Sequence, residues 1–335
     1  MGARKHNRRE FLGKVAVSVA GASLGFSLHD SVLAKTGEMP MRALGRHKEK
    51  VSLIGLGGYH LGNAADEQAA VRVVRTAIDN GITFMDNCWD YHDGRSEVWM
   101  GSALRDGYRK RAFLMTKIDG QTKESAAKQI EESLRRLQTD IIDLMQFHEV
   151  IRPGDPGRIF TAGGMEAVLE AKKAGKIRYI GFTGHKTPEF MLSMIAAGKK
   201  HGIVFDAVQM PLSALDFHFK SFEKEVLPVL VKDGTGVLAM KSLAFGQIFK
   251  TNTISAIEAH HYAMNLPVSV VITGAETIER VDQALASART FKPLDRKQVA
   301  ALLAKTAPSA AKGEFELFKT SDMFDGTAHN PQWLG

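Results

Sequence analysis

The stretch ITFMDNCWDYHDGRSEVWMGSAL (residues 82–104) carries the pattern that decides the fold of this chain. It begins with a short apolar run that predicts a buried strand, passes through the polar turn WDYHDGRS, and resumes at Ser96 with helical spacing. Glu97 in the first turn is typical of a helix N-terminus. The result is one strand–turn–helix unit, and its turn region carries an acid, Asp86, and a phenol, Tyr91, five residues apart.

The same unit recurs along the chain. Short apolar runs alternate with helical patterns, which is typical of strands buried on both faces of a parallel sheet. The predicted strands are residues 51–57, 83–87, 112–118, 141–148, 178–184, 207–212, 236–243 and 268–274. The predicted helices are residues 66–81, 96–107, 123–139, 164–176, 187–202, 219–234, 255–266 and 276–288. Eight strands alternating with eight helices predict an α/β fold of the (β/α)8 TIM-barrel type.

A doubly wound dinucleotide-binding fold is the alternative for such an alternation. It needs the pattern G-x-G-x-x-G between the first strand and the helix that follows. The segment GLGGYHLG (residues 55–62) has His60 where the third glycine belongs, and the predicted helix starts only near Asp66. The barrel is therefore favoured.

The chain divides into three predicted parts. Residues 1–34 resemble a twin-arginine export signal, with the pair Arg8 and Arg9, a weakly apolar run, and a small-residue cleavage site after Ala34. Residues 35–306 form the barrel, preceded by a hairpin in MPMRALGRHKEKV (residues 39–51). Residues 307–335 form a C-terminal tail, which starts with a small-residue linker (residues 307–313) and continues with aromatic residues. The tail either packs near the substrate mouth or covers another apolar patch.

Composition excludes several classes of protein. Of the net charge of +7, residues 1–34 contribute +3, because they hold five Lys or Arg against two acids, and the rest is only +4. With no basic stripe interleaved with aromatics, nucleic-acid binding is not expected. No apolar run reaches the roughly 18 residues of a membrane span, so no stable span is expected once the signal is cleaved. The single cysteine, Cys88, excludes a disulfide framework.

Charged residues end three consecutive predicted strands. Asp86, Lys117 and His148 are separated by 31 residues each, which is one βα unit. In a barrel they would project at the same level from adjacent strands, where active sites of this fold lie. Each residue alone has a plain structural explanation. Asp86 could be a helix cap, Lys117 a side chain that reaches the surface, and His148 a core histidine with its hydrogen bonds satisfied. Together with Tyr91 they are hard to explain by packing, because a buried charge is costly unless it is paired.

These residues and their surroundings resemble the aldo/keto reductase family over roughly residues 40–290. The resemblance rests on MDNCWDYHDGRSE, the TK of FLMTKI, DLMQFH, IRYIGFTG, VQMPLS, and VVITG with ETIER. It implies a catalytic tetrad of Asp86, Tyr91, Lys117 and His148. It further implies hydride transfer from a reduced nicotinamide to a carbonyl carbon, with Tyr91 as proton donor, Lys117 lowering the pKa of that phenol, Asp86 holding the lysine and His148 orienting the carbonyl.

The resemblance also implies cofactor-binding positions, which are Thr183, Gln209, Met240, Lys241, Gly274 and Arg280. The aromatic that often stacks on the nicotinamide is replaced by Met240. The lysine that often meets the 2′-phosphate is missing, and Glu276 stands nearby. NADP(H) is favoured by family habit, and NAD(H) is possible. Tyr59, His60 and Trp89 are the expected substrate-facing residues.

The sequence thus predicts an exported, periplasmic oxidoreductase that reduces a small aldehyde or ketone and depends on the twin-arginine export machinery. One alternative is a cofactor-binding, redox-sensing accessory subunit without turnover, and another is a barrel aldolase with Lys117 as a Schiff-base lysine. No metal is expected, because His60, His92 and His185 lack an organised ligand spacing, although all three follow strands. The remaining histidines, His218 and the pair His260–His261, are expected on the solvated surface.

Overall fold

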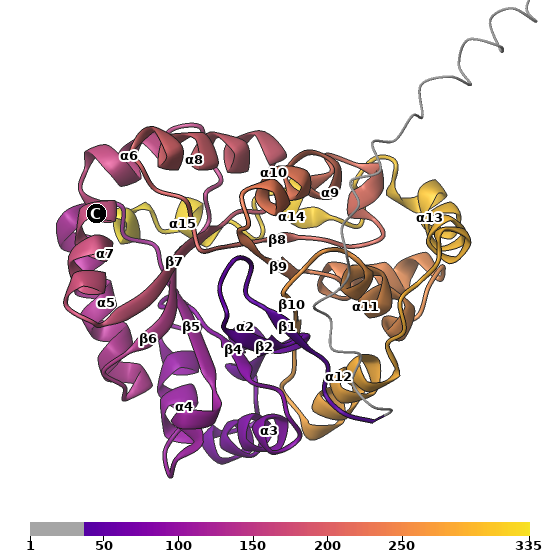
Figure 1. Cartoon of the computed structure of the whole chain (residues 1–335), viewed down its shortest axis with the longest axis horizontal. Helices are drawn as coiled ribbons and strands as arrows, with labels where there is room; N and C mark the ends of the chain where they lie inside the picture. The colour runs from indigo at the N-terminus through magenta and orange to yellow at the C-terminus, as the bar shows by residue number, and fades with distance from the viewer. Residues whose placement is uncertain (1–36) are drawn as a thin grey trace, which may run out of the picture. The chain divides into compact units, whose positions relative to one another are not determined.

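Eight parallel strands close into a barrel with helices around it, as the computed structural model shows for residues 37–335 (Figure 1). The strand order is β10-β3-β4-β5-β6-β7-β8-β9, so consecutive strands along the chain are neighbours and β10 closes the barrel on β3. This confirms the predicted (β/α)8 fold. The segment interpreted as an export signal, residues 1–34, lies outside the described residues.

The elements have the following bounds. The strands are β1 (Met41–Ala43), β2 (Lys50–Ser52), β3 (Ile54–Gly57), β4 (Phe84–Asp86), β5 (Phe113–Ile118), β6 (Ile142–Phe147), β7 (Ile177–Thr183), β8 (Ala207–Pro211), β9 (Gly236–Met240) and β10 (Val270–Gly274). The α-helices are α2 (Gly58–Leu61), α3 (Glu67–Asp79), α4 (Arg95–Ala103), α5 (Lys123–Leu137), α6 (Asp155–Thr161), α7 (Gly164–Lys173), α8 (Pro188–Lys200), α9 (Phe222–Glu225), α10 (Leu227–Lys232), α11 (Ala256–Asn265), α12 (Ile278–Thr290), α13 (Arg296–Ala310), α14 (Leu317–Thr320) and α15 (Gly326–His329). The 3-10 helices are η1 (Tyr108–Arg111), η2 (Asp216–His218), η3 (Ala244–Thr251) and η4 (Pro331–Leu334).

The structure adds helices that were not predicted, such as α6 and α13, and it divides two of the predicted elements. The apolar run 51–57 is not one strand, because its first residues belong to β2 and only the part from Ile54 joins the barrel. The helix expected over residues 219–234 is split into α9 and α10, with Pro228 in the first turn of α10. Proline lacks the N–H that an uninterrupted helix would need there, so the chain begins a new helix instead.

The predicted hairpin pairs β1 with β2 and covers the end of the barrel where the strands begin (Figure 1). The backbone N–H of Arg46 donates to the carbonyl of Gly234, just before β9, at 2.7 Å. Leu44 and Val51 pack with the apolar residues inside the barrel, such as Phe84. The hairpin therefore closes this end with apolar side chains and leaves the opposite end for chemistry.

The C-terminal tail lies across that opposite end. Helix α13 continues to Ala310, so residues 307–310 are helical rather than part of the expected linker. Beyond it, the carbonyl of Leu334 accepts from the N–H of Gln121 at 2.9 Å, and Thr327 donates to Glu149 at 2.8 Å. Both partners follow strands that carry predicted catalytic residues. Of the two placements left open by the sequence, the tail therefore takes the one at the catalytic end.

A buried ion cluster holds the middle of the tail. Lys319, with a fully buried side chain, lies 2.6 Å from Asp216 and 2.9 Å from Glu316. Removing one partner of such a cluster leaves an uncompensated charge, which typically costs roughly 3–5 kcal/mol. The tail is thus fixed to the barrel by charge as well as by apolar contacts such as those of Phe318.

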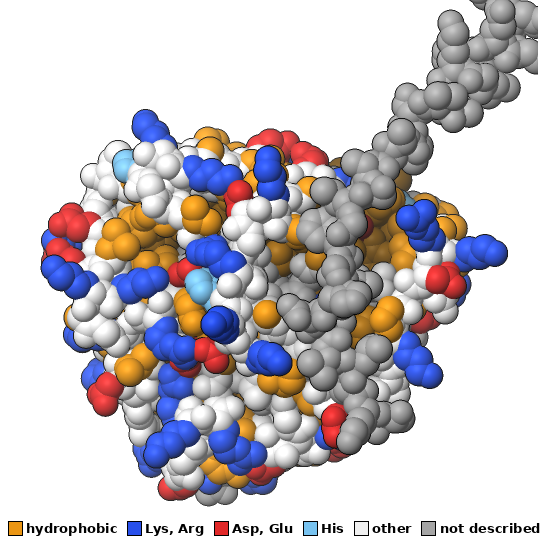
Figure 2. All heavy atoms as spheres, viewed as in Figure 1, with side chains coloured by type: hydrophobic (Ala, Val, Ile, Leu, Met, Phe, Trp, Pro, Cys, Tyr) orange, Lys and Arg blue, Asp and Glu red, His pale blue; other side chains and the backbone are white. Residues whose placement is uncertain are grey.

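The visible outer face mixes charges of both signs. In Figure 2 the Lys and Arg side chains are interspersed with Asp and Glu, and no continuous basic band crosses this face. Among the described residues there is also no helix with the length and apolar character required to cross a lipid bilayer.

His260 is not on the surface, contrary to the expectation from the sequence. It lies on the inward face of α11 and is 1% exposed. Its Nδ1 and the hydroxyl of Ser287 are 2.9 Å apart, and because that hydroxyl donates to the carbonyl of Gln283, Nδ1 carries the proton. His218 likewise contacts Thr306 at 3.2 Å. The paired histidines gave no sequence signal of which one faces the core.

Acidification should destabilise the protein through His260. Burial, with a smaller effect of His261, lowers the pKa of His260 from 6.5 to about 4. Below pH 6.5, His260 binds a proton in the unfolded chain but stays neutral in the native state. The free energy of unfolding therefore decreases between pH 6.5 and about pH 4, by up to roughly 3 kcal/mol. His260→Asn keeps a donor for Ser287 and should flatten this part of the pH dependence in urea unfolding. Equal pH slopes for variant and wild type would contradict the assignment.

Candidate active site

The four residues of the predicted tetrad converge at the catalytic end of the barrel. Asp86 is the last residue of β4, Lys117 lies near the end of β5, and His148 follows β6 directly. Parallel pairing brings the three strands side by side. Tyr91 comes from the turn between β4 and α4, and its ring meets the ring of His148 edge to face, with centroids 5.8 Å apart. The ends of these three strands bring the side chains together, although the register itself pairs Asp86 with Met115 and Lys117 with Gln146.

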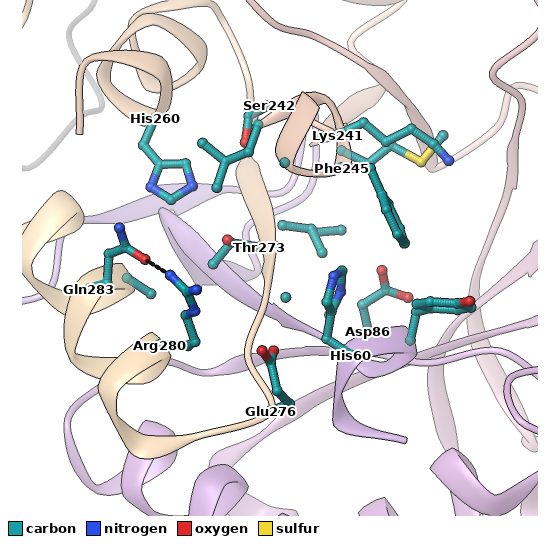
Figure 3. A pocket seen from close by; sticks show the side chains of 18 of the residues that line it. His60, Asp86, Lys241, Ser242, Phe245, His260, Thr273, Glu276, Arg280 and Gln283 are labelled. Carbon is teal, nitrogen blue, oxygen red and sulfur yellow. Dashed lines mark hydrogen bonds between the residues drawn. The ribbon is translucent and has the colours of Figure 1, made fainter. Parts of the chain in front are cut away.

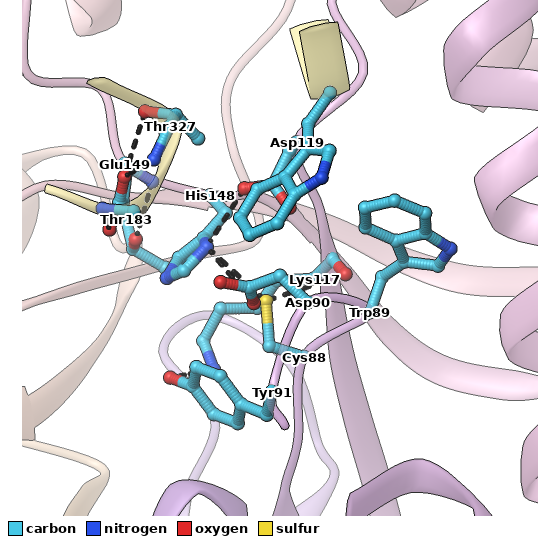
Figure 4. Close-up of polar contacts among 12 residues, drawn as sticks. Cys88, Trp89, Asp90, Tyr91, Lys117, Asp119, His148, Glu149, Thr183 and Thr327 are labelled. Carbon is cyan, nitrogen blue, oxygen red and sulfur yellow. Dashed lines mark hydrogen bonds and ion pairs between the residues drawn. The ribbon is translucent and has the colours of Figure 1, made fainter. Parts of the chain in front are cut away.

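The ammonium group of Lys117 links residues of the tetrad by hydrogen bonds (Figure 4). Its Nζ donates to Asp86 Oδ1 at 2.5 Å, to the backbone carbonyl of Asn87 at 2.7 Å and to Tyr91 Oη at 3.1 Å. All three donors of the ammonium are therefore used. Burial by itself would lower the pKa of Lys117, but the Asp86 carboxylate outweighs burial and raises it. A lysine held as an ammonium in this way is a poor nucleophile, which argues against a Schiff-base role.

Tyr91 departs from one expectation. The resemblance implies that the ammonium lowers the pKa of the phenol, whereas burial, followed by the Asp86 carboxylate, raises the pKa of Tyr91 well above its ordinary value. Both effects disfavour the phenolate, and they outweigh Lys117 because the ring is enclosed by carboxylates as well as by the ammonium. Tyr91 is consequently a protonated phenol with its oxygen fixed by Lys117.

His148 is surrounded by acceptors. Its Nδ1 lies 3.0 Å from Asp119 Oδ1, 3.3 Å from Cys88 Sγ and 3.6 Å from Asp90 Oδ1. Burial would lower the pKa of His148, but the carboxylates of Asp90 and Asp119 raise it to about 9. Burial in turn, with the Asp119 carboxylate, raises the pKa of Asp90 to about 6. Protons in this group are therefore shared among several side chains.

A cavity opens beside Tyr91 and extends towards α12 (Figure 3). Nine of the predicted site residues line it: Tyr59, His60, Asp86, Tyr91, Gln209, Met240, Lys241, Gly274 and Arg280. At its far end Arg280 donates to Gln283 at 3.1 Å, and Glu276 stands between this pair and His60. The cavity thus runs from the proton-bearing end to a charged end at the N-terminus of α12.

Gly274 has no room for a side chain at this cavity. A Cβ placed on it would lie 2.0 Å from Nδ1 of His60. Burial lowers the pKa of His60, although Glu276 acts in the opposite direction. The neutral imidazole therefore packs directly on the backbone at the end of β10, which makes the wall here flat.

Gln209 presents a group that has no partner in the protein. Its Nε2 donates to Asp86 Oδ2 at 3.0 Å, while its buried Oε1 accepts no hydrogen bond. A buried acceptor without a donor is costly, so its presence points to a ligand. Lys241, on the other side of the cavity, has a pKa lowered to about 8 by burial, with Lys117 as a further cause.

Four predicted site residues do not line the cavity. Lys117 and His148 reach it only through their contacts with Tyr91. Thr183 accepts from the N–H of Glu149 at 3.1 Å. Trp89, expected to face substrate, instead donates from Nε1 to Glu132 at 2.7 Å and packs edge to face on Trp333.

Several residues of the site were missed from the sequence, among them Phe245, Asp119 and His260, which also lines the cavity. Phe245 lies over Tyr59 and His60, at centroid distances of 5.6 and 5.1 Å, and narrows the cavity mouth. Its positive φ of 57° places it in a turn that composition does not reveal. Asp119 did have a signal, because it stands two residues after Lys117 in the run FLMTKID.

The other strand-following histidines do not meet His148. His92 contacts the carbonyl of Tyr59 at 2.8 Å, and His185 contacts Asp325 at 3.0 Å. His60 lies on the cavity wall described above. Within residues 37–335, the group of His, Cys and acidic side chains whose ligand atoms lie close together is instead Cys88, Asp90, Asp119 and His148.

Comparison with known proteins identifies the class that this fold and site define. Residues 53–258 match the model of the aldo/keto reductase family, which is more than half of the 335 residues. The chain belongs to the aldo/keto reductase family. Its members reduce small carbonyl compounds with nicotinamide cofactors, so the protein is an oxidoreductase.

Individual relatives are moderately similar. An aldo-keto reductase AFTS1 of Alternaria alternata is 28% identical over 263 residues, covering 66% of this chain and 69% of the relative. The L-galactose dehydrogenase of Arabidopsis thaliana is 26% identical over 302 residues, covering 78% and 92%. The solved holo form of the aldo-keto reductase AKR11C1 from Bacillus halodurans has a TM-score of 0.69 at 24% identity, covering 80% of this chain and 96% of that structure, which supports the fold.

Proposed function

We propose that this protein reduces an aldehyde or ketone to an alcohol with NAD(P)H, and that Tyr91 delivers the proton. One observation carries the proposal: the ammonium of Lys117 bridges Asp86 and Tyr91, at 2.5 and 3.1 Å, beside a cavity that reaches α12. A complete, fully bonded group of this kind favours turnover over a purely sensory role.

The residues around the cavity fit a nicotinamide nucleotide. The unpartnered Oε1 of Gln209 is the acceptor that a carboxamide N–H needs, and the bond from Gln209 to Asp86 fixes its direction. Met240 and Lys241 form the adjoining wall of the cavity, and Gly274 contributes backbone without a side chain. Arg280 lies at the far end, where the adenosine part of the nucleotide would bind. The hydroxyl of Thr183 accepts one bond, from the N–H of Glu149, and keeps its own O–H to donate from its buried position. When bound, the reduced nicotinamide supplies the hydride.

The protein supplies the proton and holds the carbonyl. Hydride addition leaves an alkoxide on the substrate, which is more basic than a phenolate, so Tyr91 can donate although its own pKa is raised. Lys117 then faces the phenolate at 3.1 Å and stabilises it, and Asp86 keeps that lysine charged. His148 stands against the Tyr91 ring and serves to orient the carbonyl oxygen. Tyr59, His60 and Phe245 form aromatic walls suited to a small carbonyl compound.

NADP(H) is the proposed cofactor, with NAD(H) as the alternative. Family habit favours the phosphorylated nucleotide, and Arg280 offers a positive charge at the adenosine end. Glu276 lines the same end and would repel a 2′-phosphate. The balance between the positive charge of Arg280 and the negative charge of Glu276 sets the preference between NADP(H) and NAD(H).

Export through the twin-arginine machinery is also part of the proposal. It rests on Arg8, Arg9 and the small residues before Ala34, all outside the described residues. Twin-arginine substrates cross the membrane folded, so the nucleotide would be loaded beforehand and retained, or regenerated by a partner in the periplasm.

Tyr91→Phe tests the proton donor. The variant should bind NADPH as the wild type does, because the ring remains, while kcat for carbonyl reduction falls by roughly 10²–10⁴-fold. Nucleotide binding is followed by fluorescence and turnover by NADPH absorbance. Tyr108→Phe, whose hydroxyl contacts Asp79 on the outer surface, is the matched control and should be unaffected. Near-normal turnover by Tyr91→Phe would remove the residue from the mechanism.

Glu276→Gln tests the cofactor preference. Removing the carboxylate should tighten NADPH binding by about tenfold relative to NADH, which corresponds to about 1.4 kcal/mol. Glu279→Gln changes an exposed carboxylate three residues further on, in the first turn of α12, that does not line the cavity, and should leave the ratio unchanged. Parallel fluorescence titrations with both nucleotides measure it. An equal change for both nucleotides would show that Glu276 does not face the 2′ position.

Replacing both Arg8 and Arg9 with lysine tests export. The precursor should then stay uncleaved in the cytoplasm, whereas the wild type should appear in the periplasm without residues 1–34. Cell fractionation, followed by mass spectrometry of the N-terminus, reports both properties. Unchanged periplasmic recovery of the double variant would exclude the twin-arginine route.

A further inference from the structure

Three potential metal ligands gather around His148, which is itself the fourth (Figure 4). Cys88 and Asp90 come from the turn after β4, Asp119 follows β5, and His148 follows β6. One ligand atom from each side chain lies within 4.8 Å of the others. Cys88 is 0% exposed and Asp119 is 1% exposed, whereas Asp90 and His148 are partly exposed, so the group lies at the edge of the buried region. None of the roles proposed for carbonyl reduction uses Cys88, Asp90 or Asp119.

The hydrogen bonds within this group are incomplete. A single nitrogen, Nδ1 of His148, faces Asp119 Oδ1 at 3.0 Å, Cys88 Sγ at 3.3 Å and Asp90 Oδ1 at 3.6 Å. One nitrogen carries at most one proton, so it cannot serve both carboxylates, and the Cys88 thiol is itself a weak donor, 3.7 Å from the Lys117 carbonyl. Asp90 Oδ1 and Asp119 Oδ2 are buried and have no hydrogen-bond partner. Buried acceptors of this kind need a positive group between them.

The ligand types and their spacing suit a zinc-class cation. Zinc is bound by cysteine sulfur at about 2.3 Å and by histidine nitrogen and carboxylate oxygen at about 2.0–2.2 Å, in tetrahedral geometry. Ligand atoms of such a site are separated by roughly 3.3–3.8 Å. The separations of 3.0, 3.3 and 3.6 Å around Nδ1 are close to this range. A sulfur, a nitrogen and two oxygens disfavour Mg²⁺ and Ca²⁺, which take oxygen ligands.

Hydrogen bonds to the backbone fix the segments that carry these side chains, and they do not involve a cation. Gln129 Oε1 accepts from the N–H groups of Asp119 and Gly120, at 2.8 and 2.7 Å, and its Nε2 donates to the tail carbonyl of Trp333 at 2.9 Å. The N–H of His148 donates to Ile118, the residue before Asp119, at 2.8 Å. Fixing the segments that carry ligands is what a metal site requires of its surroundings.

We propose that Cys88, Asp90, Asp119 and His148 bind one zinc-class divalent cation. The site shares His148 with the proposed reductase function, but neither nucleotide nor substrate takes part in binding the cation. The cation bonds to Nδ1 of His148, which leaves the ring proton on Nε2. The imidazole is then fixed in one tautomer and one orientation, as a donor on the side away from the cation.

Metal binding is tested on the purified full chain after treatment with a chelator. Zn²⁺ titrated by calorimetry should bind with a stoichiometry of one per chain, and metal analysis of untreated protein should find the same ratio. Co²⁺ in place of Zn²⁺ should give the sulfur-to-metal charge-transfer absorption of a thiolate ligand, together with the visible bands of tetrahedral cobalt. Neither readout needs nucleotide or substrate, so failure here leaves the reductase proposal intact.

Variants assign the ligands. Cys88→Ser should abolish the charge-transfer absorption, and Cys88→Ser and Asp119→Asn should each weaken Zn²⁺ binding by about 100-fold or more. Asp93→Asn, an exposed residue of the same turn outside the cluster, is the control and should bind as the wild type does. Circular dichroism verifies folding, and the wild-type Co²⁺ spectrum tests sulfur ligation even where a variant does not fold. Absence of stoichiometric Zn²⁺ binding, or a Co²⁺ spectrum without the sulfur absorption, would overturn the site and show that the four side chains share protons instead.

Discussion

The catalytic end of this barrel depends on the buried ion pair between Lys117 and Asp86. An isolated ammonium in this position would cost several kcal/mol, and Asp86 Oδ1 at 2.5 Å compensates that cost. The remaining donors of Lys117 fix the Asn87 carbonyl and the Tyr91 hydroxyl. The other oxygen of Asp86 fixes Gln209. One ion pair therefore positions the proposed proton donor and the proposed carboxamide acceptor together, so a change that breaks it disturbs both.

The barrel around this pair was predictable because its signals are local. Each strand is a short apolar run between helical segments, and the spacing of one βα unit predicted that Asp86, Lys117 and His148 would stand at the ends of neighbouring strands. The apolar run 51–57 was harder, because the division between β2 and β3 depends on pairing with β1 rather than on composition.

Residues whose position depends on distant partners were not predictable. Trp89 sits between Asp86 and Tyr91 in the chain, but its direction is set by Glu132 and by Trp333 in the tail. His260 was expected on the solvated surface because it lies in a helical pattern, whereas packing against α12 buries it. The raised pKa of Tyr91 likewise follows from burial, which no local pattern reports.

The contacts of the C-terminal tail make the proposed active site depend on both ends of the described chain. The bond from Gln129 to Trp333 joins residues 204 positions apart. The pairing of Ile54 in β3 with Val271 in β10, which closes the barrel, joins residues 217 positions apart. Both contacts require large loops to close. The segments after β5 and β6 are therefore held in place only when the chain is folded almost to its last residue.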